Sequence, residues 1–333
     1  MKRFMSFVLA LAFILFACTT KVKEPLPTPT EALITATLSA SQTPASKNSN
    51  SLPPTSTPSS STFVPGFAHI VVIIFENKEA SSVIGNPEMP AYNRMAQAYA
   101  SLEQYYAVAH PSLPNYLALI GGDTFGVQSD CTKCFINATS LPDEIETSGR
   151  TWKAYQESMP KPCFIGSVVL YAQKHNPFIY FDPIRLDQKR CEQHIVPLTQ
   201  MQVDLDNQSF PDFAFISPNI CNDAHDCPLK SADSWLDQIL NTLIPALDAD
   251  KQPYLIVLTW DEGQGSHSCC GLPQYAGGRV ATVLISPQVK NGFKDETPYT
   301  HYSLLKTIEA AWGLPFLGHA VDEQNAIIVA PWK

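Results

Sequence analysis

Apolar runs of strand length recur along the chain. They are HIVVIIFEN (69–77), FAFISPN (213–219), YLIVLTW (254–260) and ATVLISP (281–287). Continuous apolar runs, unlike alternating ones, are typical of strands that are buried on both faces. We therefore expect a mainly parallel central sheet.

Segments with helical spacing lie between these runs. We expect helices over residues 90–104, 114–122, 142–158, 231–247 and 300–313. The last has Thr300 as a possible N-cap and Gly313 as a C-terminal stop. Strands that are separated by helices predict an α/β fold with helices on both faces of the sheet. No internal repeat or second boundary is visible, so we expect one folded domain over residues 65–333.

The start of the chain predicts export. Lys2 and Arg3 precede an apolar run, Phe4–Ala17, which is too short to span a bilayer and is typical of a signal peptide over residues 1–17. The run ends in LFAC, which resembles a bacterial lipobox, so we expect Cys18 to be lipidated. The alternative is an ordinary secretory signal with an incidental Cys.

Residues 18–64 predict a tether. They are rich in Ser, Thr and Pro and contain almost no large apolar side chains. Such a segment buries too little surface to offset the entropy of ordering, so we expect it to be disordered. About 45 residues of this kind span tens of ångströms. The expected protein is a cell-surface or periplasmic lipoprotein, joined to the membrane by its lipid; a secreted protein is the alternative.

Charge and composition narrow the class of function. The chain has 333 residues, of which 45% are hydrophobic, and its net charge is −9. This balance, without a basic patch or an RNA-binding motif, argues against nucleic-acid binding. An acidic protein does not attract anions as a whole, so any anion site must be local. We expect a monomer.

Eight cysteines follow Cys18, and an even number in an exported chain favours disulfides. Because adjacent cysteines form a strained bond, we expect Cys269 and Cys270 to have separate partners. Cys131 and Cys134 form a C-x-x-C motif, for which half of a zinc site is the alternative interpretation. No matching second pair of Cys or His residues follows at the right spacing. Sequence spacing favours the pairs Cys131–Cys134, Cys163–Cys191 and Cys221–Cys227.

Acidic and polar side chains follow two of the predicted strands. Glu76 and Asn77 close the first apolar run, and Asp261 and Glu262 come directly after the third. In an open parallel sheet, ligands bind beyond the carboxyl ends of the strands. Carboxylates that are crowded there repel one another, and a divalent cation removes the repulsion. The two pairs therefore predict a metal site, rather than unrelated solvated charges.

A serine near a predicted helix start is a candidate nucleophile. In AHPSLPNYLALIGG (109–122), Ser112 lies just before the helical segment that starts near Pro114. Backbone N–H groups at a helix N-terminus favour anions, and Asn115 can donate a further hydrogen bond. An ordinary N-cap serine fits the position equally well.

Several motifs together resemble the bacterial phosphoesterase family, which holds acid phosphatases and phospholipases C and belongs to the alkaline phosphatase superfamily. The resemblance covers residues 68 to 320 and implies a single alkaline-phosphatase-like domain. The motifs are HIVVIIFEN, HPSLPNYLALIGG, SPNICNDAHD, TWDEG, GGRVATVLISP and YTHYSLLKTIE.

The resemblance also implies roles for single residues. Ser112 would attack phosphorus, and His225 or His175 would protonate the leaving alcohol. The metal would be held by Glu76, Asn77, Ser112, Asp261 and Glu262. The phosphate pocket would be lined by His110, His175 and His225. Independently of the resemblance, Asn115 is expected to bind phosphate, and the possible further pocket residues are His301, Asp223 and Asp226.

These parts predict a metal-dependent acid phosphatase that hydrolyses phosphate monoesters through a phosphoserine. Such hydrolysis needs rate enhancements of up to ~10²¹, and acid–base catalysis supplies only ~10²–10⁴, so charge neutralisation and positioning must dominate. One divalent ion is expected: Ca²⁺, Mg²⁺, Mn²⁺, Zn²⁺ or Fe. A phospholipid head group, cleaved by phospholipase C or phosphoinositide phosphatase activity, is the alternative substrate. An anchored, non-catalytic anion-binding protein is the second alternative.

Overall fold

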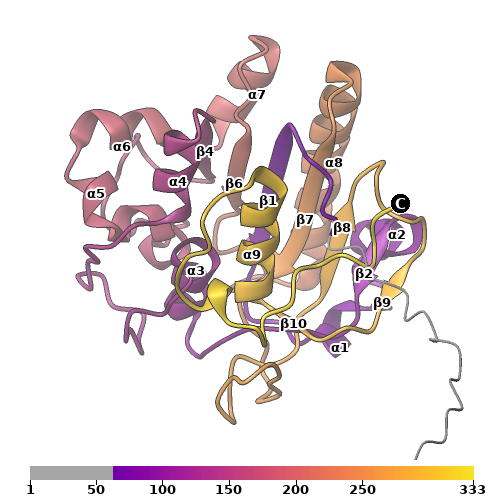
Figure 1. The fold of residues 1–333 in the computed structure, drawn as a ribbon. Coiled ribbons are helices and arrows are strands. Elements are labelled where there is room, and N and C mark those ends of the chain that lie inside the picture. The colour runs from indigo at the N-terminus through magenta and orange to yellow at the C-terminus, as the bar shows by residue number, and fades with distance from the viewer. Residues whose placement is uncertain (1–62) are drawn as a thin grey trace, which may run out of the picture. The chain divides into compact units, whose positions relative to one another are not determined.

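The central element of the fold is an eight-stranded sheet with the strand order β5-β4-β6-β1-β7-β8-β2-β9 (Figure 1). The computed structural model describes residues 63–333. The predicted signal peptide and Cys18 lie outside this range, as does nearly all of the predicted tether. A second sheet pairs β3 (Tyr105–Tyr106) with β10 (Tyr299–Thr300).

The middle of the sheet consists of strands that the apolar runs predicted. β1 pairs in parallel with β6 and β7, and β4 continues the parallel set from β6 to β5. Only toward the other edge does β8 run antiparallel, to both β7 and β2. The strands are β1 (His69–Phe75), β2 (Ala100–Leu102), β4 (Trp152–Gln156), β5 (Ile195–Pro197), β6 (Phe213–Ser217), β7 (Tyr254–Trp260), β8 (Thr282–Ile285) and β9 (Lys294–Asp295). The mainly parallel sheet is therefore confirmed.

Helices and 3₁₀ turns connect these strands. The α-helices are α1 (Ala80–Val83), α2 (Pro90–Ala98), α3 (Ser112–Gly121), α4 (Leu141–Thr147), α5 (Asp182–Arg185), α6 (Gln188–His194), α7 (Thr199–Asp206), α8 (Leu229–Asp250) and α9 (His301–Trp312). The 3₁₀ turns are η1 (Gln173–His175), η2 (Pro177–Tyr180) and η3 (Gly318–Val321).

The helices cover both faces of the sheet, as predicted (Figure 1). Side chains along a strand point alternately to the two faces. Phe75 packs on α8 and Trp260 packs on α2, while Phe213 and Phe215 pack on α9 and α3. The residue that follows Phe75 or Trp260 is therefore placed to face α3, and this alternation positions the site described below.

Two predicted helices are shorter in the structure. The pattern over 90–104 gives α2, which ends at Ala98 because the next residues pair with β8 as strand β2. The pattern over 142–158 divides into α4 and β4. Gly149, with φ of 82°, breaks the helix there, and the following residues pair with β6. Local spacing missed both strands because neighbouring strands stabilise them.

The last predicted helix is confirmed in detail. The Thr300 side chain accepts a hydrogen bond from Ser303 N, and Gly313 ends α9 in the left-handed conformation with φ of 65°. The helix predicted over 231–247 is the longer α8. Within residues 63–333, no helix is both long and apolar enough to cross a membrane.

Four disulfides are present. The three pairs that spacing favoured are formed, and the fourth joins Cys269 to Cys270, so the prediction of separate partners for these two was wrong. The other six cysteines in residues 63–333 are paired among themselves. Within these residues, Cys269 and Cys270 therefore have only each other as disulfide partners.

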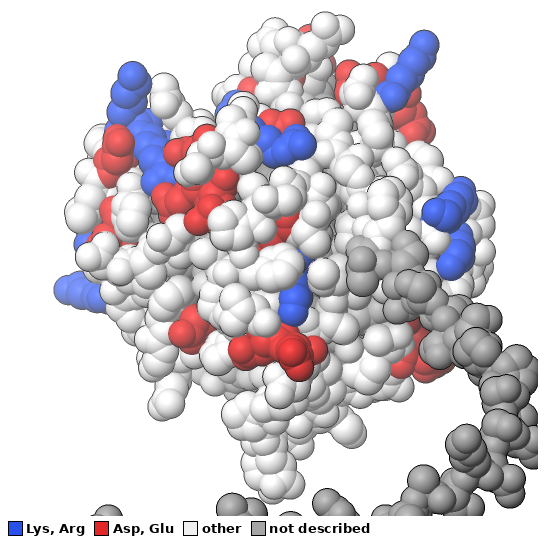
Figure 2. Space-filling view, viewed as in Figure 1, with Lys and Arg blue, Asp and Glu red and all other residues white. Residues whose placement is uncertain are grey.

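Charged side chains are mixed on the surface. On the face of residues 63–333 that Figure 2 shows, Lys and Arg are interspersed with Asp and Glu. This face therefore offers no region of one charge that would attract anions.

Candidate active site

Glu76 and Asp261 lie at neighbouring strand ends. Phe75 and Trp260 are register partners in β1 and β7, and the next residue of each strand is a carboxylate. Both carboxylates are fully buried. The backbone N–H of Asn77 donates to Asp261 Oδ1 at 2.9 Å, which ties the two strand ends together. The pairing that the sequence predicted is therefore present.

Ser112 is the first residue of α3 and lies against these carboxylates. Its Oγ is 3.0 Å from Glu76 Oε2 and 3.2 Å from Glu262 Oε1, so the hydroxyl can donate to either. The side chain is buried, and only 1% of Ser112 is exposed. The fold thus brings the predicted nucleophile to both acidic pairs.

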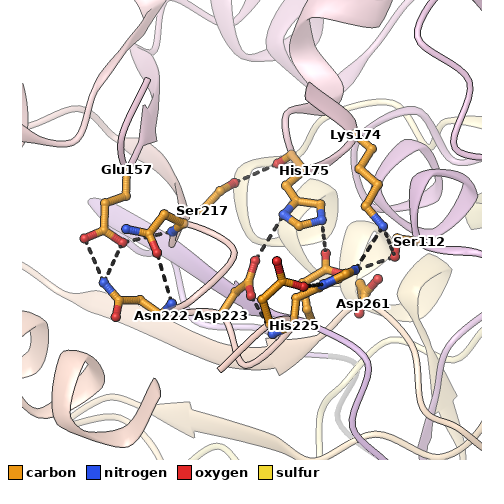
Figure 3. Close-up of polar contacts among 12 residues, drawn as sticks. Ser112, Glu157, Lys174, His175, Ser217, Asn222, Asp223, His225 and Asp261 are labelled. Atoms are coloured by element: carbon orange, nitrogen blue, oxygen red, sulfur yellow. Dashed lines mark hydrogen bonds and ion pairs between the residues drawn. The ribbon is translucent and has the colours of Figure 1, made fainter. Parts of the chain in front are cut away.

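Lys174 places a positive charge beside Ser112, which the sequence analysis did not predict. Its Nζ lies 3.4 Å from Ser112 Oγ and 3.4 Å from His225 Nε2 (Figure 3). It also lies 2.9 Å from Asp130 Oδ2. Burial lowers the pKa of Lys174, but the surrounding carboxylates outweigh burial and the pKa is raised overall. The ammonium therefore stays charged. Its position next to His175 was the one signal in the sequence.

His175 lies behind Glu76 rather than in an open pocket. Its Nε2 is 3.1 Å from Glu76 Oε1, and its Nδ1 is 3.1 Å from Asp223 Oδ2. The ring stacks on Tyr116, whose hydroxyl donates to Glu76 Oε1. Only 3% of the His175 side chain is exposed. This position differs from the predicted phosphate contact, because His175 faces carboxylates on both sides.

His225, like His110, is a predicted site histidine that reaches the surface. About a third (33%) of its side chain is exposed, and its Nδ1 lies 2.6 Å from Asp226 Oδ1. The backbone N–H of His225 donates to Asp223 Oδ1 at 2.7 Å. Asp223 and Asp226 therefore hold the histidine from both sides while its Nε2 faces Lys174 (Figure 3).

His110 and His301 support the second acidic pair. His110 Nδ1 contacts Glu262 Oε2, and its Nε2 lies 2.9 Å from Gly265 O. The hydrogen bond to Glu262 is the main cause that raises the pKa of His110 to about 9. His301 is fully buried, and its Nε2 lies 2.6 Å from the backbone oxygen of Asp261. Both histidines thus act on the carboxylate pair.

The structure gives Asn115 a different role from the phosphate contact that the sequence predicted. Its Oδ1 accepts from the N–H groups of Val108 at 2.9 Å and Ala109 at 3.0 Å. Its Nδ2 donates to Ala109 O at 2.9 Å and Pro111 O at 3.2 Å. The buried amide is fully used in shaping the loop before α3, so it is not free to donate to phosphate.

The sequence model of the Phosphoesterase family matches residues 85–315. The chain belongs to this phosphoesterase family. It is therefore a hydrolase that acts on phosphoric esters.

Two relatives of this phosphoesterase carry more specific names. It is 33% identical over 266 residues to a phosphatidylinositol-3-phosphatase of Mycobacterium tuberculosis, covering 78% of this chain and 81% of that one. It is 37% identical over 233 residues to an acid phosphatase of Aspergillus fumigatus, covering 65% of this chain and 49% of that one. The phosphoesterase thus spans about half the length of the Aspergillus relative.

Solved structures share the fold. A protein of the alkaline phosphatase superfamily from Vibrio parahaemolyticus matches with a TM-score of 0.52 at 13% identity, covering 82% of this chain and 72% of that one. The alkaline-phosphatase-like α/β architecture is therefore confirmed.

The donor set of this phosphoesterase fits a cation. Glu76, His175 and Asp223 offer ligand atoms that all lie within 4.8 Å of one another. Asp261 Oδ2, Asp223 Oδ2 and His175 Nε2 are buried without an aligned hydrogen-bond partner among the described residues. Burial and then the neighbouring carboxylates raise the pKa of Asp261 to about 8, and that of Glu76 well above its usual value. A divalent cation would supply the missing partner and remove the repulsion.

A cavity of about 670 Å³ adjoins His110. Its wall combines apolar and aromatic side chains with polar ones, among them Val108, Ala109, Leu272, Tyr275, Tyr302 and Gln128. It is large enough for the alcohol part of a phosphate ester.

Proposed function

We propose that this phosphoesterase is an acid phosphatase that forms a phosphoserine at Ser112. The supporting observation is that one buried hydroxyl meets two carboxylates and the Lys174 ammonium. A serine that only capped α3 would need none of these partners. The Aspergillus relative, an acid phosphatase, supports the same reaction.

One divalent metal ion belongs to this proposal. Glu76, Asn77, Asp261 and Glu262 would hold it together with Ser112, as the strand-end pairs predicted. A bound divalent ion supplies Lewis-acid stabilisation of charge and lowers the pKa of a coordinated hydroxyl. Glu76, His175 and Asp223 form a second ligand set that shares Glu76. The first set uses oxygen donors, and the second adds the imidazole of His175; both kinds of donor suit the metals named above.

The chain's own groups account for the transfer. Ser112 Oγ attacks phosphorus and gives its proton to a hydrogen-bonded carboxylate, while the bond from phosphorus to the ester oxygen breaks. Lys174 stabilises charge on the phosphoryl oxygens. A protonated His225 donates its Nε2 proton to the leaving alcohol, with Asp226 orienting the ring. Water then attacks the phosphoserine, which restores Ser112 and releases phosphate.

The remaining residues position these groups. His110 orients Glu262, and Tyr116 orients Glu76 together with His175. Asn115 shapes the loop that carries His110.

The test is removal of the Ser112 hydroxyl. Ser112→Ala should lower hydrolysis of p-nitrophenyl phosphate by at least about 10³-fold, the scale expected for loss of an activated nucleophile. Acid-quenched parent enzyme should carry one phosphoryl group by mass spectrometry, and the variant none. Ser234→Ala, an exposed serine on α8, is the matched control. Full activity in Ser112→Ala would contradict the assignment.

A phosphorylated lipid head group is the second candidate substrate. The mycobacterial phosphatidylinositol-3-phosphatase shares most of its length with this chain, and a phosphoinositide phosphate is itself a monoester. Release of inorganic phosphate from this lipid would support it. Release of diglyceride from phosphatidylcholine would indicate phospholipase C, and tight phosphate binding without turnover a non-catalytic protein.

Export and lipid anchoring complete the proposal. Lipidation of Cys18 would hold the enzyme on the outer side of a bacterial membrane. Cys18→Ser should then move the protein from the membrane fraction to the soluble fraction, whereas an ordinary secretory signal would leave both proteins soluble.

A further inference from the structure

Four exposed aliphatic side chains lie together on one loop. Val169 is 93% exposed, Ile165 is 44% exposed, and Val168 and Leu170 are each 39% exposed. Eleven large apolar side chains are exposed in residues 63–333, and these four fall within six consecutive positions. Single exposed apolar residues are ordinary, whereas contiguous ones mark interaction surfaces. We call residues 165–170 the aliphatic loop.

The aliphatic loop is held in shape by the rest of the protein. The Cys163–Cys191 disulfide anchors its base. At its tip, Val168 N donates to Tyr171 O at 3.0 Å and Tyr171 N donates to Val168 O at 2.6 Å. Backbone groups that are paired inside the protein can enter apolar surroundings without losing hydrogen bonds to water. The paired backbone groups of Val168 and Tyr171 therefore do not oppose burial of the loop in an apolar phase.

The sequence around the loop lacks charge. Residues 162–173, PCFIGSVVLYAQ, contain no charged side chain, in a chain of which 16% is charged. Lys161 and Lys174 border this stretch. Entry of the tip into lipid would therefore bury no charge, and exposed Lys161 could remain at the polar surface.

The aliphatic loop adjoins the open side of the active site. Lys174 follows Leu170 closely in sequence, and Leu170 O accepts a hydrogen bond from Ile220 N at 3.0 Å. Ile220 precedes the turn that carries His225. Ser112 is buried, while 33% of the His225 side chain and 20% of the Lys174 side chain are exposed. The site is also open at His110, whose side chain is 39% exposed. The opening at His225 and Lys174 is the one that lies beside the loop.

We propose that the aliphatic loop is a membrane-docking element that inserts Val168, Val169 and Leu170 into a lipid surface. Docking there would present phosphorylated lipid head groups to Ser112. The proposal rests on the phosphatase function proposed above and names its substrate class. A phosphatidylinositol phosphate is cleaved by the same monoester chemistry.

The composition of the loop favours lipid over a protein partner. Hot spots of protein interfaces are enriched in Trp, Tyr and Arg, and Leu and Val are under-represented in them. The exposed side chains of the aliphatic loop are those of Ile, Val and Leu residues, with Ser167 as the one polar exception. The mycobacterial relative, whose name gives it a membrane-lipid substrate, is consistent with this choice.

The test separates docking from catalysis. The full chain carrying Cys18→Ser, which removes the predicted lipid, is the parent protein. Val169→Asp in this parent is compared with Leu186→Asp, a 67% exposed apolar residue outside the loop. Each protein is measured for sedimentation with phosphatidylcholine vesicles that contain phosphatidylinositol 3-phosphate. Hydrolysis is measured on these vesicles, on p-nitrophenyl phosphate and on a short-chain, water-soluble form of the lipid.

Val169→Asp should weaken vesicle binding and vesicle hydrolysis by at least about tenfold, since a charge replaces an inserted apolar side chain. Its activity on both soluble esters should equal that of the parent, which also shows that it is folded. Leu186→Asp should match the parent throughout. If the parent and Val169→Asp bound vesicles equally, the proposal that the aliphatic loop docks on lipid would be overturned. A parent that binds vesicles through Val169 yet hydrolyses no ester would leave docking in place and overturn the phosphatase function.

Discussion

The Lys174 ammonium lies 3.4 Å from the Ser112 hydroxyl oxygen. Asp130 Oδ2, at 2.9 Å from the same ammonium, holds it there. These side chains come from turn η1, from the start of α3 and from the loop after α3. The contact places the positive charge where phosphoryl oxygens would gather during attack by Ser112, so it carries the first prediction.

Removal of the Lys174 charge should slow phosphoryl transfer. Lys174→Met is expected to lower kcat/KM for p-nitrophenyl phosphate by about 10²–10³-fold, the usual effect of losing one preorganised charge partner. Lys174→Arg should keep part of the activity, and Lys161→Met, an exposed lysine outside the site, should keep all of it. Unchanged kcat/KM in Lys174→Met would show that this charge does not act in the reaction.

Chelation should remove both activity and stability. A ligand that binds only the folded state adds about 2.7 kcal/mol at 100 times its Kd. Treatment with EDTA is therefore expected to lower the Tm and abolish turnover, and an added divalent ion should restore both. Calorimetry with and without Mg²⁺, Mn²⁺, Ca²⁺ or Zn²⁺ measures the shift. If EDTA changed neither the Tm nor the activity, a removable metal ion would be excluded.

The two ligand sets that share Glu76 make different predictions. If the strand-end pairs hold the ion, Asp261→Asn should lose the metal-dependent rise in Tm, and Asp223→Asn should keep most of it. The reverse order would assign the ion to Glu76, His175 and Asp223. Metal titrations of the two folded variants decide between them.

Asn115 should matter for stability. Its buried amide makes hydrogen bonds to the backbone of the loop before α3, and truncation leaves buried donors without partners. Asn115→Ala is expected to lower the free energy of unfolding by about 3 kcal/mol. Urea denaturation measures this, with Asn241→Ala on the exposed side of α8 as the control. A variant as stable as its parent would contradict the scaffold role.

Glu309 should make the protein less stable as pH rises. The carboxyl is fully buried in α9, and burial raises its pKa to about 8. Its pKa in the unfolded chain is about 4.3, so between these values the folded protein binds the extra proton. The protonated Glu309 carboxyl therefore contributes stability that is fully present below its pKa in the unfolded chain. This contribution is lost as the pH rises toward 8.

Glu309→Gln removes this titration. The variant should lose less stability than the parent between about pH 5 and pH 8, by on the order of 2–5 kcal/mol. Urea midpoints at the two pH values give the comparison, and Glu88→Gln at an exposed position is the control. Parallel pH dependence in Glu309→Gln and its parent would place the effect elsewhere.

Several parts of the fold and the site follow from local sequence. The strands β1, β6 and β7 appear as apolar runs because a buried parallel strand needs apolar side chains on both faces. Thr300 and Gly313 mark the ends of α9 because capping depends on neighbouring residues. The strand-end acids were visible because their charge interrupts a buried pattern.

Tertiary structure alone decided the rest. The contact of Lys174 with Ser112 joins positions 62 residues apart, and that of His110 with Glu262 joins positions 152 apart. Spacing along the chain carries no record of such contacts. The same holds for β4. Its residues have helical spacing in the sequence, but in the structure they pair with β6 and form a strand. Sequence thus determined which residue types stand at the strand ends. Packing of distant segments determined which of them face Ser112, because side-chain contacts depend on how the elements assemble.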